Sequence, residues 1–147
     1  MKIRSIGILL FILSIIVYTW YTLSSEKYTK GDLLLTNHVR FSGRIIAYDK
    51  STNHAYGIIK IKVTETNTKA FVDSTSSRLF PYKIKGGYAE FYGYIPVSVK
   101  VGHLILLDSD KRKLEISDNN NFIIGSDVRI SSDKDNLAFV KLHTMFR

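Results

Sequence analysis

The residues that most often do chemistry are few in this 147-residue chain, and they lie far apart. There is no cysteine, which excludes disulfide scaffolds, thiolate zinc sites, iron–sulfur clusters and cysteine nucleophiles. Neither a Gly-x-Ser-x-Gly elbow nor a phosphate-binding glycine loop is present. The histidines occur singly, so a metal site would require the fold to bring together distant ones among His38, His54, His103 and His143. The sequence therefore predicts no catalytic residue, no metal ligand and no cofactor.

Lysine and tyrosine side chains are the better candidates for binding. Residues 36–105 contain ten Lys and Arg against four Asp and Glu, whereas residues 106–147 contain seven of each. Cations interleaved with aromatic rings suit a ligand that offers phosphates and rings to stack on. The alternative is a solvated basic face above tyrosines that simply pack on a sheet. The candidate binding residues are Lys60, Lys62, Lys83, Lys85, Tyr88, Tyr92 and Tyr94.

An uncharged segment near the N-terminus predicts a transmembrane helix. No charged residue lies between Arg4 and Glu26, and residues 6–23 are mainly apolar. As a helix, residues 6–23 would be about 27 Å long, close to the ~30 Å hydrocarbon core of a bilayer. The alternative is a cleaved signal peptide. Retention is favoured by the length of the run, by the lack of a small-x-small cleavage site and by aromatic residues clustered at 18–21.

The order of the segments predicts the topology. Two basic residues precede the apolar run and two follow it closely, so the positive-inside rule does not decide the orientation. A short tail, an apolar helix and then a folded domain is the layout of a signal-anchor. We therefore expect a cytoplasmic tail at 1–5, a signal-anchor helix at 6–23, a linker at 24–36 and an extracytoplasmic β domain at 37–147.

The β domain is expected to be all-β because its apolar residues recur with a period of two. In residues 57–64, for example, Ile59 and Ile61 alternate with lysines. Short strands between turn-forming segments favour a small closed or partly open β-barrel, OB-like in type, with a β-sandwich as the alternative. The strands are expected near 38–48, 55–65, 69–73, 87–95, 103–107, 113–116, 122–130 and 137–146.

These features favour a single-pass membrane protein with a non-catalytic β domain that binds or scaffolds at the cell envelope. Besides the membrane itself, the expected partners are an envelope protein, an anionic lipid or a cell-envelope polymer. Nucleic acid is disfavoured by the expected external location. The alternative is an envelope enzyme or ligand carrier whose site is assembled by the fold from Asp or Glu with His54, His103 or His143.

Overall fold

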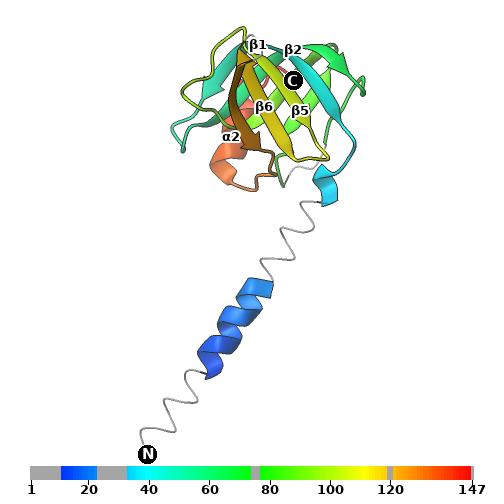
Figure 1. Cartoon of the computed structure of the whole chain (residues 1–147). Coiled ribbons are helices and arrows are strands. Elements are labelled where there is room, and N and C mark those ends of the chain that lie inside the picture. The colour runs from blue at the N-terminus through cyan, green and yellow to red at the C-terminus, as the bar shows by residue number, and fades with distance from the viewer. Residues whose placement is uncertain (1–10, 23–32, 74–76, 119–120, 147) are drawn as a thin grey trace, which may run out of the picture. The chain divides into compact units, whose positions relative to one another are not determined.

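The chain divides into two compact units, Met1–Leu34 and Leu35–Arg147. The computed structural model describes residues 11–22, 33–73, 77–118 and 121–146 (Figure 1). The expected cytoplasmic tail at 1–5 lies outside the described residues, as does most of the expected linker at 24–36.

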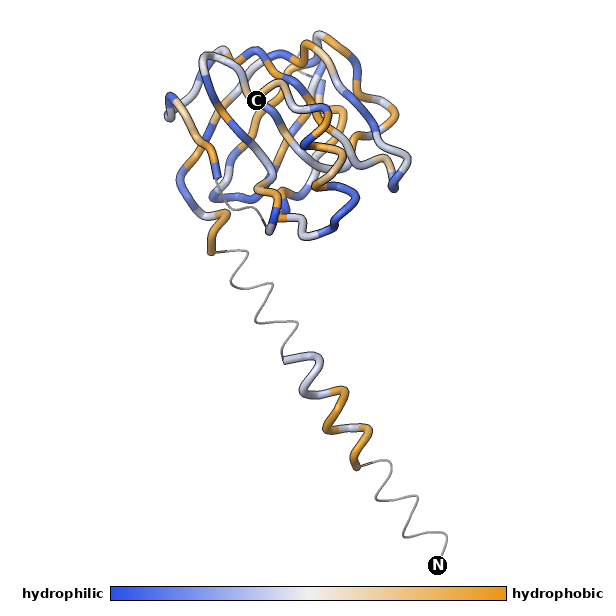
Figure 2. Tube along the Cα trace, turned by 180° about the vertical axis from the view of Figure 1, so that it is seen from behind, coloured by the Kyte–Doolittle hydropathy of each residue, from blue (hydrophilic) through white to orange (hydrophobic). Residues whose placement is uncertain are grey.

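The first unit contains a helix at residues 11–22, within the segment predicted to be a signal-anchor (Figure 2). Its hydroxyl groups donate to carbonyls three residues earlier at 2.7 to 2.9 Å, from Ser14, Thr19 and Thr22. Residues 6–10 and residue 23 of the predicted anchor lie outside the described residues. Within the described ranges, no helix is both long and apolar enough to cross a membrane.

The second unit is mainly β, as predicted, and its strands form one antiparallel sheet in the order β3-β4-β2-β1-β5-β6-β7 (Figure 1). The strands are β1 (Arg40–Lys50), β2 (Tyr56–Thr66), β3 (Tyr82–Lys85), β4 (Tyr88–Tyr94), β5 (Leu104–Asp108), β6 (Lys113–Asp118) and β7 (Asn121–Asp127). Gly86 and Gly87 form the two-residue turn between β3 and β4, with φ of 61° and 80°. Two successive positive φ angles are typical of a type I′ hairpin, which glycine adopts without strain.

The inner face of the sheet forms a single core. Ile59 and Ile61 of β2 are fully buried in it, as their alternation with lysines predicted. Strands from both halves of the sheet contribute, including Phe41 and Ile45 of β1 and Ile105 of β5. One cluster is therefore enclosed by one curved sheet.

The sheet is open, so the closed form of the expected barrel is wrong. β3 and β7 are its two edges, and no ladder joins them within the described ranges. A single antiparallel bridge links the flanking segments, with Leu79 and Ser131 exchanging hydrogen bonds of 2.7 and 3.0 Å. β3 has only four residues, and Pro81 before it has no N–H to extend the pairing. Within the described ranges, the two edges are therefore linked by this bridge between their flanking segments and by no ladder.

The strand predicted at 137–146 is wrong, because residues 137–143 belong to helix α2 (Lys134–His143). Asp133 caps the helix, and its side chain accepts a hydrogen bond from the backbone N–H of Asn136 at 2.9 Å. An acidic residue in the first turn and basic residues in the last turn complement the helix dipole. The strand predicted at 69–73 reduces to one bridge between Phe71 and Ile84.

Candidate functional site

The outer face of β2, β4 and β3 brings most of the predicted binding residues together. In register across the three strands, Lys60 lies beside Glu90, which lies beside Lys83. The neighbouring row consists of Lys62, Tyr88 and Lys85. The four lysines thus share a face, opposite the side chains in the core.

One end of this face is covered by α2. Ile58, Tyr92 and Val140 of α2 form a second small hydrophobic cluster, and each is at most 5% exposed. Tyr92, which the sequence nominated for binding, is therefore buried beneath the helix. We call the part of the face under α2 and the residues that follow it the covered end.

Glu90 is the polar centre of the covered end, and its side chain is completely buried. Its carboxylate accepts hydrogen bonds from the hydroxyls of Tyr92 and Thr144, both at 2.6 Å, and from the backbone N–H of Met145 at 2.7 Å. A buried carboxylate is costly unless donors surround it. Glu90 therefore fixes the C-terminal segment onto the sheet.

The lysines differ in what they contact. Lys60 forms an ion pair of 2.8 Å with Asp49 of β1. Lys83 donates to the carbonyl of Phe146 at 3.2 Å and lies 5.5 Å from the centre of its ring. By contrast, Lys62 and Lys85 are exposed.

Tyr88 lies between Lys62 and Lys85 and is 43% exposed. We call Lys62, Tyr88 and Lys85 the open row. Tyr94, at the other end of β4, is also exposed but is separated from the open row by the covered end. The binding residues predicted from the sequence therefore lie in three separate places on this face of the sheet.

Burial also changes the acidity of three tyrosines. It raises the pKa of Tyr82 to about 12, and it raises the pKa values of Tyr56 and Tyr92 further. The cause is loss of water around the phenolate form. These hydroxyls remain protonated and serve as hydrogen-bond donors, as Tyr92 does towards Glu90.

The four histidines lie in different parts of the fold. His38 contacts Asp110 at 3.0 Å, and this hydrogen bond lowers the pKa of the Asp110 carboxyl. His54 lies in the β1–β2 turn, His103 is buried before β5, and His143 stacks on Phe139 with ring centres 4.2 Å apart. Among the described residues, no three His, Asp or Glu side chains gather as metal ligands would.

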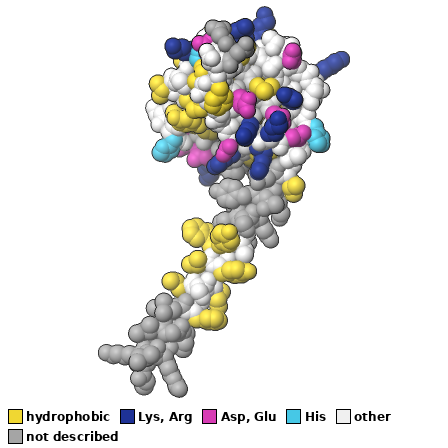
Figure 3. Space-filling view, in the orientation of Figure 1, with side chains coloured by type: hydrophobic (Ala, Val, Ile, Leu, Met, Phe, Trp, Pro, Cys, Tyr) yellow, Lys and Arg dark blue, Asp and Glu magenta, His cyan; other side chains and the backbone are white. Residues whose placement is uncertain are grey.

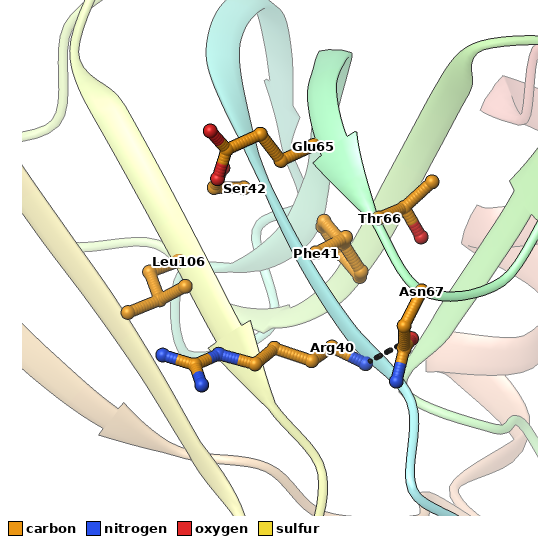
Figure 4. A pocket seen from close by; sticks show the side chains of 7 residues that line it. All are labelled: Arg40, Phe41, Ser42, Glu65, Thr66, Asn67 and Leu106. Atoms are coloured by element: carbon orange, nitrogen blue, oxygen red, sulfur yellow. Dashed lines mark hydrogen bonds between the residues drawn. The ribbon is translucent and has the colours of Figure 1, made fainter.

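A shallow depression of about 510 Å³ lies on β1, where its register with β2 shifts (Figure 4). Asn67 accepts a hydrogen bond from the backbone N–H of Arg40 at 2.9 Å and so ties the two strand ends together. Arg40 and Glu65 bring one charge of each sign to its lining. The hydroxyl of Ser42 lies 3.4 Å from the hydroxyl of Thr64, and that of Thr66 donates to the carbonyl of Thr68 at 2.9 Å.

A second hollow, of about 560 Å³, lies between β4 and β7, where the sheet is open. We call it the seam groove. Its lining residues are Tyr56, Tyr92, Gly93, Tyr94, Gly125, Ser126, Asp127, Arg129, Ile130 and Ser131. Of these, the sequence had nominated Tyr92 and Tyr94 alone, because local alternation does not reveal which strand edges fail to pair.

Charge is mixed on the opposite part of the β unit. Figure 3 shows basic and acidic side chains interspersed over the face that carries β5 and β6. This agrees with the equal numbers of basic and acidic residues from 106 onwards. The open row is therefore the clearer candidate for binding an anion.

Comparison with known proteins adds no further guide to the site. No family model matches the chain, and neither a curated protein nor a solved structure matches it. The function is therefore inferred from the geometry of the described surface.

Proposed function

We propose that this chain is a single-pass membrane protein whose extracytoplasmic β domain is a non-catalytic binding module for a polyanion. The ligand would present phosphate or similar groups, either as anionic lipid headgroups or as a cell-envelope polymer. The observation that carries the proposal is the open row, in which two exposed lysines flank an exposed tyrosine on adjacent strands. Cations beside a ring suit a charged chain that lies across the strands.

The membrane anchor in this proposal rests on the N-terminal segment. No residue between Arg4 and Glu26 is charged, and the described helix at 11–22 satisfies its hydroxyl groups internally. Such internal bonds are what a helix in lipid requires of its polar side chains. The proposal places the N-terminus in the cytoplasm and the β domain outside the membrane.

The same proposal takes the β domain as a partly open, OB-like barrel. Its support is the single core shared by strands from both halves of the sheet, together with the bridge between Leu79 and Ser131. A β-sandwich would instead divide the strands between two sheets.

The test of the polyanion site compares two double variants of the full chain in phosphatidylcholine nanodiscs. Lys62→Gln with Lys85→Gln removes the charges of the open row. Lys69→Gln with Lys100→Gln removes the same charge from exposed positions elsewhere in the basic stretch. The probes are long-chain polyphosphate and, separately, phosphatidylglycerol vesicles.

We expect the open-row variant to bind the effective probe about 30-fold more weakly, because each basic residue near an anionic surface contributes about 1 kcal/mol. The control variant should lose much less. Binding of polyphosphate alone would identify a polymer ligand, and binding of vesicles alone would identify a lipid. Equal losses in both variants, or no binding of either probe, would refute the assignment.

Topology has a separate test. Protease added to intact cells or spheroplasts should remove a C-terminal tag, and alkaline carbonate should leave the full-length protein in the membrane. Protection of the tag or release by carbonate would contradict the anchored topology.

A further inference from the structure

The seam groove lies where the curved sheet lacks a strand. β3 pairs with β4 only as far as Phe91, and Pro81 accepts from Tyr92, so within the described ranges no strand pairs with Gly93 and Tyr94 on that side. β7 is the other edge of the sheet. The groove between these two edges extends along residues 92–94 of β4 and from Gly125 to Ser131.

The β7 wall of the groove presents main-chain groups. Ser126 pairs with Leu114 of β6, and the backbone N–H of Val128 donates to the carbonyl of Arg112 at 3.0 Å. In an antiparallel pair, successive residues point their main-chain groups to opposite sides of the strand. The N–H and C=O groups of Gly125 and Asp127 therefore point away from β6, towards the groove.

The β4 wall presents main-chain groups as well. The backbone N–H of Ile95 donates to Ala55 beside β2, so Tyr94 points its main-chain groups the other way. Tyr92, two residues earlier, uses the same side to donate to Pro81 at 2.7 Å. If the register of β3 and β4 continued, Leu79 would lie opposite Tyr94. Leu79 pairs with Ser131 instead.

The hydroxyl of Ser126 donates to the carbonyl of Asp127 at 3.5 Å, and the N–H groups of Gly125 and Asp127 remain directed at the groove. Gly125 has no side chain, and a Cβ atom placed there would meet nothing closer than 3.6 Å. Asp127 and Arg129 form an exposed ion pair of 3.0 Å at the rim. The aromatic rings of Tyr56 and Tyr94 line the groove beside the free edge.

We propose that the seam groove binds an extended segment of a partner polypeptide, which adds a strand to β7 along Gly125 and Asp127. Main-chain hydrogen bonds would supply the affinity, and alternate side chains of the segment would contact the tyrosines. An extended polypeptide is the ligand chemistry that matches a row of main-chain donors and acceptors. This site is separate from the open row and does not depend on the polyanion function.

The experiment selects binders for the full chain in phosphatidylcholine nanodiscs from a displayed library of random linear dodecapeptides. The selected peptides should slow amide hydrogen exchange in residues 121–131 and 92–96. Asp127→Pro removes one N–H that faces the groove, on an edge where proline is tolerated. It should weaken peptide binding at least tenfold, whereas Asp127→Ala, which removes the same carboxylate, should change it less than twofold.

A second measurement does not depend on how the proline variant folds. A selected peptide is N-methylated at one alternate set of residues and then at the other. Strand addition predicts unequal losses, because alternate N–H groups of an added strand face opposite sides.

Four results would overturn the proposal. These are failure to select any peptide, protection of other segments, equal binding by the proline and alanine variants, and equal losses from the two methylation patterns. Protection of residues 121–131 that rises with the concentration of the chain alone, and disappears in Asp127→Pro, would show that the occupant is a second copy instead of a partner.

Discussion

The outer face of β2, β4 and β3 has two ends. Alternation in the sequence assigns both ends to the same face, but in the fold one end is covered and the other is exposed. At the covered end, Ile58 and Tyr92 lie under α2, and Glu90 is completely buried. Four residues after Ile58 on the same strand, Lys62 is exposed and belongs to the open row. The difference arises because the C-terminal segment covers only part of the face.

The comparison teaches that alternation identifies which side chains share a face, but not what lies on that face. Glu90 is bound by Thr144 and Met145, which are 54 and 55 residues away in the chain. Covered in this way, part of β4 is buried on both sides of the sheet. The predictions that follow probe this difference, beginning with the largest effect.

The strongest test replaces Ile58 by lysine. If α2 covers this position, Ile58→Lys places an unpaired charge in an apolar cluster and should destabilise the domain by more than about 3 kcal/mol. If the position were open, lysine would be tolerated there as it is at residue 62. Urea unfolding of the full chain, followed by circular dichroism, measures the difference.

Lys62→Ala is the matched control, since residue 62 lies on the same face of the same strand. It should change the free energy of unfolding by less than about 0.5 kcal/mol. Similar midpoints for Ile58→Lys and Lys62→Ala would show that α2 does not cover the face.

The next test removes the carboxylate at the centre of the covered end. Glu90→Ala leaves the hydroxyls of Tyr92 and Thr144 and the N–H of Met145 without their acceptor. We expect a loss of about 2–3 kcal/mol and faster amide exchange at residues 144–146. Glu90→Gln should lose less, because it keeps an acceptor oxygen and the two hydroxyls can reverse their direction. Unchanged exchange at residues 144–146 in Glu90→Ala would contradict the role of Glu90 in fixing this segment.

Alkaline pH tests the three tyrosines whose pKa values are raised, of which Tyr82 and Tyr92 are buried and Tyr56 is half-buried. Because folding raises the pKa of Tyr82 from 10.0 to about 12, the folded domain holds its proton where the unfolded chain has lost it. The stability that this provides is complete below pH 10 and is lost as the pH rises through 12. Tyr56 and Tyr92 act in the same direction.

The domain should therefore unfold cooperatively in alkali, and the tyrosinate absorbance of these residues should rise together with the loss of near-ultraviolet circular dichroism. Tyr92→Phe removes one of the ionising groups from the covered end, so it should make the alkaline loss of stability less steep. Gradual ionisation with the dichroism unchanged through pH 12 would contradict the burial of these hydroxyls.

Local sequence patterns predicted most of the strands, but not β3, which lies between the strands expected at 69–73 and 87–95. Ile59 and Ile61 are buried opposite the lysines of β2, as their alternation predicted. These features depend on neighbouring residues only. They also paired Lys60 with Lys62 and Lys83 with Lys85, but only the register of β2, β4 and β3 places the two pairs on one face.

The remaining features depend on segments that are distant in the chain. Helix α2 buries only Asn136 and Val140, so its apolar stripe is too thin for periodicity to distinguish it from a strand. The signal that could have identified it is Asp133, a good N-cap residue three positions before Asn136. The open edges at the seam groove follow from strand pairing across the whole domain, which no local pattern reports.

The smallest expected effect is a difference among the four lysines in how much they contribute to the free energy of unfolding. The sequence treated them as equivalent, but Lys60 pairs with Asp49 and Lys83 holds the carbonyl of Phe146. Lys60→Gln combined with Lys83→Gln should therefore cost about 1 kcal/mol, since a partly exposed ion pair and one hydrogen bond each contribute modestly. The double variant of Lys62 and Lys85 should stay within about 0.5 kcal/mol of the parent. Urea midpoints, measured at an unchanged m-value, distinguish the two variants. In 1 M salt the difference between their free energies of unfolding should be smaller, because salt screens the Lys60–Asp49 pair. If the open-row variant were the less stable of the two, the division of this face into a covered end and an open row would be wrong.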